Sequence, residues 1–227
     1  MIEKPRYLIA GDRALVVEFG DQIDPATNAR VRRLDQLLES HPIEGVLETV
    51  PTFRSLLVVY DPLFIRFDDL VLKLEELESE PAEPRDPKQT VIIPTVYGGD
   101  FGPDIHFVAR HNQISVDEVI RLHTSREYLV YMIGFTPGFP YLGGLPRTIA
   151  APRLQTPRTK VPAGSVGIAG EQTGIYPTES PGGWQLIGRT PLKLFDPNKK
   201  NPVLLVPGDR VRFEPIDERK FMELVRL

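Results

Sequence analysis

The segment from Gly134 to Pro191 constrains the fold more than any other part of the chain. It holds 11 of the 18 glycines and 9 of the 23 prolines in a sequence of 227 residues. Glycine and proline at this density interrupt helices, and short strand-like runs stand between them. After Arg126 no long helical period returns until the extreme C-terminus. The segment therefore predicts a β-barrel or a β-sandwich.

Residues 1–80 show a different pattern. Asp24 followed by Pro25 is the preferred cap and first residue of a helix, and a second helix is predicted over Phe67–Glu78. Apolar runs predict strands at Tyr7–Ala10, Ala14–Phe19, Val46–Val50 and Ser55–Tyr60. The order of two strands, helix, two strands, helix predicts a sheet with both helices on one face.

A charged, proline-rich run separates the two parts. Three prolines lie between Glu78 and Lys88, and the rest of that run is mostly charged, so it does not form a core element. We expect domains at 1–80 and 90–227, joined by a linker at 81–89. The second domain opens with a strand at Thr90–Pro94.

Composition excludes several classes of protein. The net charge of −4 argues against a general nucleic-acid binder, and the absence of cysteine rules out disulfides and thiolate metal sites. The N-terminus lacks a signal-peptide pattern. Apolar runs such as Ser55–Tyr60 are far shorter than the roughly 20 residues that span a bilayer. A cytoplasmic protein without nucleic-acid or membrane partners is predicted.

Charge within the glycine-rich segment is sparse and positive. Its seven charged residues carry a net charge of +3, against −7 for the rest of the chain. A surface of low charge with concentrated cations suits a pocket for a small anion. A barrel whose arginines face solvent fits the composition equally well.

Most familiar catalytic motifs are absent. The sequence has no G-x-x-x-x-G-K-[ST] phosphate loop, and its four histidines lack metal-ligand spacing, so no metal site is expected. His123 ends a helix whose start is predicted by the capping box at Ser115–Glu118. We favour an interaction of His123 with the helix dipole over a role as general base.

One aromatic loop is distinctive. Phe135-Thr-Pro-Gly-Phe-Pro-Tyr141 presents three aromatic residues on a backbone restrained by two prolines and a glycine. Such a loop suits a hydrophobic cleft or a partner surface. A loop that caps the core is the alternative.

Long, ordered motifs carry a resemblance to one known family. They are Gly11–Gly20, Tyr131–Pro146, Thr156–Arg158, Val161–Gly170, Gln172–Pro177 and Ser180–Pro191. Over these motifs the chain resembles allophanate hydrolase subunit 1. That family includes the B subunit of the ATP-dependent 5-oxoprolinase and an inhibitor of the sporulation sensor kinase.

The resemblance implies an α+β fold, with a ferredoxin-like N-terminal domain and a cyclophilin-like β-barrel C-terminal domain. It also implies a subunit, inactive alone, of a complex that opens 5-oxoproline to L-glutamate with ATP. The companions would resemble allophanate hydrolase subunit 2 and a lactam-utilisation (LamB/YcsF-like) protein. The alternative from the same family is an inhibitor that binds a histidine kinase and blocks its autophosphorylation.

Site residues follow from the same resemblance and from the chemistry of lactam opening. Arg158 and Arg189 would bind anions, and Gln172 and Tyr176 would hydrogen-bond the lactam or a water molecule. Phe135, Phe139 and Tyr141 would line the cleft, and His123 is a candidate acid or base. ATP would bind together with a partner subunit; the sequence leaves open whether Mg²⁺ accompanies it.

Overall fold

The computed structural model describes residues 4–80 and 90–226. The chain divides into two compact units, Met1–Pro87 and Lys88–Leu227. The predicted linker at 81–89 lies outside the described residues.

The first unit is a four-stranded antiparallel sheet with two helices. Its strands follow the order β1-β2-β4-β3. The elements are β1 (Arg6–Ile9), β2 (Ala14–Glu18), α1 (Pro25–Ser40), β3 (Val46–Pro51), β4 (Ser55–Tyr60) and α2 (Phe67–Ser79). In this order β2, α1 and β3 form a split βαβ unit with β4 between its strands, as in ferredoxin-like folds. β1 occupies the edge position beside β2.

Local sequence signals account for this unit. The Asp24 carboxylate accepts hydrogen bonds from the backbone N–H groups of Ala26 and Thr27 at 2.9 and 3.0 Å, so α1 begins where the sequence predicts. Val31 and Leu34 of α1 are buried in the same core as Leu15 and Leu56 of the sheet. Because alternate sheet residues and one stripe of each helix are apolar, a single hydrophobic layer forms between them.

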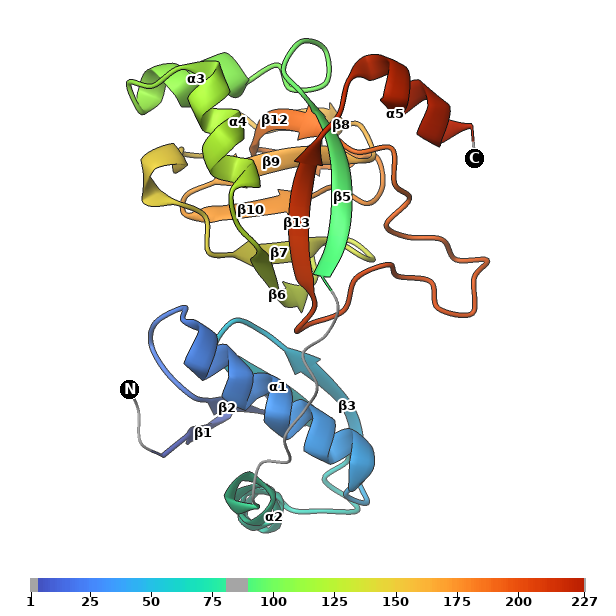
Figure 1. The fold of residues 1–227 in the computed structure, drawn as a ribbon. Coiled ribbons are helices and arrows are strands. Elements are labelled where there is room, and N and C mark those ends of the chain that lie inside the picture. The colour runs from blue at the N-terminus through green and yellow to red at the C-terminus, as the bar shows by residue number, and fades with distance from the viewer. Residues whose placement is uncertain (1–3, 81–89, 227) are drawn as a thin grey trace. The chain divides into compact units, whose positions relative to one another are not determined.

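The second unit is a closed β-barrel (Figure 1). Its strands close in the order β10-β7-β6-β13-β5-β12-β9, in which β13 and β5 are parallel. The barrel strands are β5 (Thr90–Tyr97), β6 (Tyr128–Ile133), β7 (Pro140–Gly143), β9 (Ser165–Ala169), β10 (Gln172–Ile175), β12 (Gln185–Arg189) and β13 (Arg210–Pro215).

Shorter elements complete this unit. Strands β8 (Arg158–Val161) and β11 (Ser180–Gly182) pair as a separate two-stranded sheet. The helices of this unit are α3 (Ile105–His111), α4 (Val116–Thr124), the short 3₁₀ helix η1 (Arg147–Ile149) and α5 (Glu218–Val225), and several of them pack on the barrel. None of the helices in the described residues is long and apolar enough to cross a membrane.

Glycine makes the tight barrel wall possible. A Cβ at Gly143 would lie 1.5 Å from the ring of Tyr131, so no larger residue fits there without rearrangement. The predicted α+β class is confirmed: a sheet with helices in the first unit, and a barrel built largely from the glycine-rich segment in the second.

Candidate aromatic binding cavity

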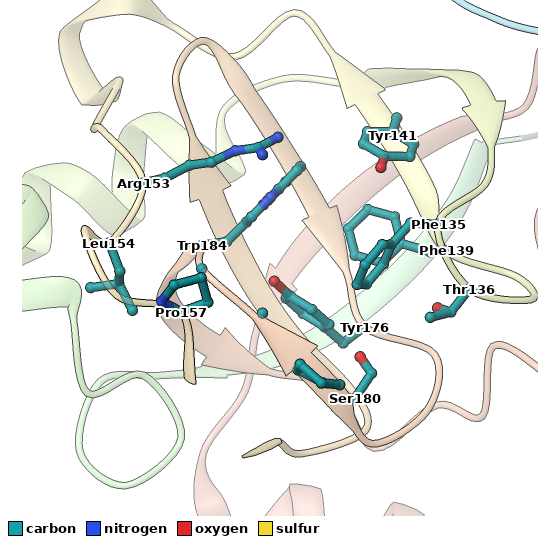
Figure 2. A pocket seen from close by; sticks show the side chains of 13 residues that line it. Phe135, Thr136, Phe139, Tyr141, Arg153, Leu154, Pro157, Tyr176, Ser180 and Trp184 are labelled. Carbon is teal, nitrogen blue, oxygen red and sulfur yellow. The ribbon is translucent and has the colours of Figure 1, made fainter. Parts of the chain in front are cut away.

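A cavity of about 410 Å³ opens on the barrel unit beside the aromatic loop. Most of its wall is apolar or aromatic, as is usual for small-molecule sites. The lining residues that matter here are Phe135, Thr136, Phe139, Tyr141, Arg153, Tyr176, Ser180 and Trp184. They come from the β6–β7 loop, β7, the segment before β8, the residue after β10, and the region of β11 (Figure 2).

The β6–β7 loop places its two phenylalanines differently. The Thr136 N–H donates to the Gly134 carbonyl at 2.7 Å, and Phe135 between them has a φ of +65°. A three-residue turn of this hand is strained for a bulky residue, and such strain is concentrated at functional sites. Phe135 is 62% exposed, whereas Phe139 is 1% exposed. The loop therefore caps a core with one ring and presents the other at the cavity.

The aromatic rings form one cluster. The centroid of the Phe139 ring lies 5.2 Å from Tyr176 and 5.4 Å from Trp184, both edge-to-face. Phe135 is edge-to-face with Phe139 at 5.6 Å. A Cβ at Gly182 would come within 2.3 Å of the Tyr176 hydroxyl, so this glycine lets β11 approach the ring. Burial raises the pKa of Tyr176 further above neutrality.

Arg153 supplies the positive charge at this cavity. Its guanidinium lies 5.9 Å from the centroid of the Trp184 ring, in cation–π range. The neighbouring Leu154 N–H donates to the Gly183 carbonyl at 2.7 Å, which holds this segment beside Trp184. The Arg153 side chain is exposed, and within residues 4–80 and 90–226 it has no ion-pair partner. It is therefore available to an anionic ligand.

Two of the lining residues carry a buried hydroxyl that has no hydrogen-bond partner within residues 4–80 and 90–226. They are Thr136 Oγ1 in the aromatic loop and Ser180 Oγ at the start of β11. Buried polar groups in proteins are nearly always paired, so both are exceptions.

Four predicted site residues meet at this cavity: Phe135, Phe139, Tyr141 and Tyr176. Arg158 lies outside its lining and is engaged elsewhere, because its Nη2 pairs with Asp104 Oδ1 at 2.7 Å. Asp104 Oδ2 accepts a second bond from the Leu186 N–H at 2.7 Å. The Arg158 guanidinium therefore ties β8 to the start of α3, and its Nη1 also donates to the carbonyl of the cavity-lining Trp184 at 3.5 Å.

Arg189 and Gln172 are also placed apart from the cavity. Arg189 lines a different hollow, together with Lys193 and Met222 of α5, and its Nε donates to the Ala163 carbonyl at 2.8 Å. Gln172 begins β10 and pairs with Ala169 of β9. The structure thus brings neither residue to the aromatic rings.

His123 lies inside the barrel and is fully buried. Its ring nitrogens contact Tyr97 Oη at 2.8 Å and Thr173 Oγ1 at 3.0 Å. Burial lowers the pKa of His123 to about 3. A neutral imidazole has no charge to offer the dipole of α4, so the dipole interpretation is wrong. The ring also does not reach the cavity, which leaves it no contact with a ligand there.

Comparisons with known proteins show the family of this chain. Residues 5–205 match the family described as carboxyltransferase domain, subdomain C and D. The chain belongs to this family. It is 46% identical to the B subunit of 5-oxoprolinase from Bacillus subtilis, over 95% of each chain. The family resemblance read from the sequence motifs is thereby confirmed.

Two solved structures contain a similar fold within a longer chain. The protein TTHA0988 is 38% identical with a TM-score of 0.82; the match covers 90% of this chain and 40% of that one. The urea amidolyase of K. lactis is 27% identical with a TM-score of 0.78, covering 98% of this chain and 15% of that one. In both, this chain corresponds to a module of a larger polypeptide.

The cavity's donor set does not fit a nucleoside triphosphate. Such a group is normally held by a glycine-rich loop with a lysine, or by several cations and a metal. Here the lining contributes one guanidinium. In the part of the chain that the structure describes, no group of three or more His, Cys, Asp or Glu side chains could hold a metal ion.

The sequence does not predict that Arg153, Thr136, Ser180 and Trp184 line one cavity. It shows only that Arg153 is one of four arginines in the glycine-rich segment. Arg147 pairs with Glu171 and Arg158 with Asp104, while Arg189 is bonded to a backbone carbonyl. Asp104 lies far from Arg158 in the sequence, so the sequence alone does not reveal which arginine stays free.

Proposed function

We propose that this chain is the B subunit of an ATP-dependent 5-oxoprolinase, a cytoplasmic complex that opens 5-oxoproline to L-glutamate. The observation that carries the proposal is the match of 46% identity to such a subunit over 95% of both chains. The aromatic cavity supports it, because its wall suits a small ring and its guanidinium suits a carboxylate.

Within the complex, the cavity binds and orients 5-oxoproline. The rings of Trp184, Tyr176 and Phe139 pack against the lactam ring and exclude water from it. Arg153 pairs with the substrate carboxylate; its long, exposed side chain can move over the cavity opening. Positioning of this kind lowers the barrier by holding the amide carbon where the reacting groups of the complex can reach it.

Companion subunits supply the rest of the reaction. Because the cavity does not fit a triphosphate, ATP, and any Mg²⁺ with it, binds on or together with a companion. We assign the companion roles to proteins resembling allophanate hydrolase subunit 2 and a LamB/YcsF-like lactam-utilisation protein. The occurrence of this module inside longer chains such as urea amidolyase supports an obligatory neighbour.

The test is ATP-dependent release of glutamate from 5-oxoproline by the purified chain and by the chain mixed with both companions. Activity is expected in the mixture only. Arg153→Ala should raise the KM for 5-oxoproline about 10–100-fold, because a charge-assisted bond to the carboxylate is lost. Arg210→Ala is the matched control, since Arg210 pairs with Glu127 on the surface away from the cavity.

A verified assembly without activity would contradict the proposal. It would favour the alternative in which the exposed aromatic loop docks on a histidine kinase, and inhibition of kinase autophosphorylation would then be measured. If the complex is active but Arg153→Ala leaves the KM for 5-oxoproline unchanged, the enzymatic function stands. The assignment of Arg153 in this cavity as the site of the substrate carboxylate is then wrong.

A further inference from the structure

A second hollow, of about 300 Å³, lies on the barrel unit between the end of β12 and helix α5. Its wall is formed by the turn between β8 and β9, the segment after β12 and one face of α5. The residues that matter here are Arg189, Lys193, Met222 and Val225. The proposed binding of 5-oxoproline uses none of them.

The Arg189 guanidinium is fixed at one edge and open at the other. Its Nε donates to the Ala163 carbonyl at 2.8 Å, whereas its two Nη groups have no hydrogen-bond or ion-pair partner among the described residues. The Nη groups are not among the buried atoms that lack a partner, so they are accessible to solvent. The Thr190 N–H donates to the Gly164 carbonyl at 2.9 Å and holds the β8–β9 turn against this strand end. The guanidinium is therefore preorganised to bind an anion.

Charge around this hollow is positive. Between Arg189 and Lys200 the chain carries four cations and one carboxylate, that of Asp196. This carboxylate is engaged, because its oxygens lie 3.1 Å from Lys193 Nζ and 3.1 Å from the Asn198 N–H nitrogen. The residues that line the hollow, all within the described part of the chain, include no carboxylate. The charge of Arg189 is therefore not balanced from within the hollow.

Helix α5 presents an exposed apolar face at the same hollow. Met222 and Val225 lie three positions apart, on one side of the helix, and are 51% and 55% exposed. Phe221 holds the helix in place, because it is buried and packs edge-to-face on Phe101 with ring centroids 4.8 Å apart. Methionine and arginine are enriched in protein–protein interfaces. An unpaired guanidinium beside exposed apolar side chains thus favours a protein ligand over a small anion.

The hollow and the aromatic cavity are neighbours. Tyr176 lines the cavity, and the next residue, Pro177, lines the hollow. The N–H of Gly164, which lines the hollow, donates to the Tyr176 carbonyl at 2.7 Å. A protein bound in the hollow therefore lies beside the wall of the cavity.

We propose that the hollow around Arg189 is the docking site for an acidic segment of a companion subunit. The segment presents a carboxylate to the guanidinium and apolar side chains to Met222 and Val225. This inference rests on the proposed function, which requires companion subunits. Docking here places the companion beside bound 5-oxoproline, where the reacting groups that it supplies are needed. Arg153 then contacts the substrate, and Arg189 contacts the partner.

Two measurements separate docking from substrate binding. The first is the dissociation constant of the chain for each purified companion, the subunit 2-like protein and the LamB/YcsF-like protein, by isothermal titration calorimetry. The second is a titration of Trp184 fluorescence with 5-oxoproline in the chain without companions. Trp184 is the one tryptophan of the sequence and lines the aromatic cavity, so its signal reports on that site. The KM for 5-oxoproline at saturating companion repeats the second measurement in the complex.

Arg189→Ala should weaken binding of one companion about 10–100-fold and reduce its dependence on salt, because a charge-assisted bond is lost. Met222→Ser should weaken binding of the same companion roughly three- to ten-fold, because less apolar surface is buried. In both variants the affinity for 5-oxoproline should stay within two-fold. Arg153→Ala should show the reverse pattern.

Lys220→Ala is the matched control. Lys220 lies on α5 outside the lining of the hollow and pairs with Glu223 at 3.4 Å, so the variant removes a positive charge nearby without touching the docking site. Unfolding midpoints show whether Arg189→Ala disturbs the turn at Ala163. Met222→Ser tests the surface without affecting that bond.

The inference is overturned if Arg189→Ala and Met222→Ser bind both companions as the parent does, or if Lys220→Ala weakens binding as much as Arg189→Ala. It is also overturned if assembly is unchanged while Arg189→Ala raises the KM for 5-oxoproline or ATP, since the hollow then binds a small anion of the reaction. In each case an active parent complex leaves the proposed function standing.

Failure of the proposed function gives a different result. A parent complex that assembles but releases no glutamate contradicts that function, and weaker assembly of the two variants still supports the docking site. A parent chain that binds neither companion overturns both proposals.

Discussion

Two clusters of polar and aromatic side chains in the barrel unit differ in how their polar groups are paired. Around His123, every polar side chain has a partner. The Thr173 hydroxyl donates to the Gly167 carbonyl at 3.0 Å, so it accepts from His123 Nε2, and His123 Nδ1 accepts from Tyr97. Around the aromatic cavity, the buried Thr136 and Ser180 hydroxyls have no hydrogen-bond partner among the described residues, and the exposed Arg153 has no ion-pair partner there.

This difference marks the His123 cluster as structural and supports the proposal that the cavity is a binding site. A closed network inside the barrel stabilises one arrangement of the strands and has nothing left to offer a substrate. At the cavity, by contrast, the exposed guanidinium of Arg153 and the exposed ring of Phe135 remain available to a ligand. Residue type alone would point to the wrong cluster. Histidine is a common catalytic residue, whereas serine and threonine hydroxyls occur throughout proteins.

The largest effect is expected from His123→Ala. The substitution leaves a cavity and strands the Tyr97 and Thr173 hydroxyls, so the free energy of unfolding should fall by about 3–5 kcal/mol. Urea unfolding followed by Trp184 fluorescence measures it. Folded variant protein should still bind 5-oxoproline at low temperature. A stable variant without ligand affinity would reverse the assignment of the two clusters.

Arg158→Ala tests whether Arg158 contributes to stability or to ligand binding. Loss of its ion pair leaves the half-buried Asp104 carboxylate with the Leu186 N–H as its remaining partner, which should cost about 1–2 kcal/mol of stability. Affinity for 5-oxoproline should stay within two-fold. Arg153→Ala should show the opposite pattern, with lost affinity and unchanged stability. If Arg158→Ala abolishes binding while the fold is unaffected, the sequence-based anion role returns.

Acid should weaken the barrel through His123. Burial holds its pKa at about 3 against 6.5 in the unfolded chain, so between these values the unfolded state binds more protons. Stability from the neutral ring is complete above pH 6.5 and is lost on acidification, by up to about 1.4 kcal/mol per pH unit. Unfolding free energies of the parent and of His123→Gln between pH 6.5 and 5 measure the difference in slope. Parallel slopes would contradict a buried neutral imidazole.

The smallest effect is expected from Gln172→Ala. Gln172 begins β10 outside both clusters, so stability should change by less than about 0.5 kcal/mol and affinity by less than two-fold. A larger loss of affinity, measured by the same Trp184 titration, would extend the binding site to this edge of the barrel.

Much of the fold was predictable because its signals are local. The Asp24–Pro25 start of α1, the capped start of α4 at Ser115 and the absence of long helices after Arg126 all appear in the structure as the sequence indicates. The aromatic loop could be singled out because prolines and glycines restrain it locally. The different exposure of Phe135 and Phe139 could not be predicted from the sequence, because it depends on contacts with Tyr176 and Trp184, which come later in the chain.

The sequence alone determined the fold class, the family and the aromatic character of the candidate site. Periodicity, caps and turn residues act over a few positions, so they can be read along the chain. Closure of the barrel decided which polar groups are paired. It brings Asp104 to Arg158 and Thr173 to His123, and it leaves the exposed Arg153 beside a cavity without an ion-pair partner among the described residues. Pairing depends on contacts between distant segments, and these exist only once the barrel has formed.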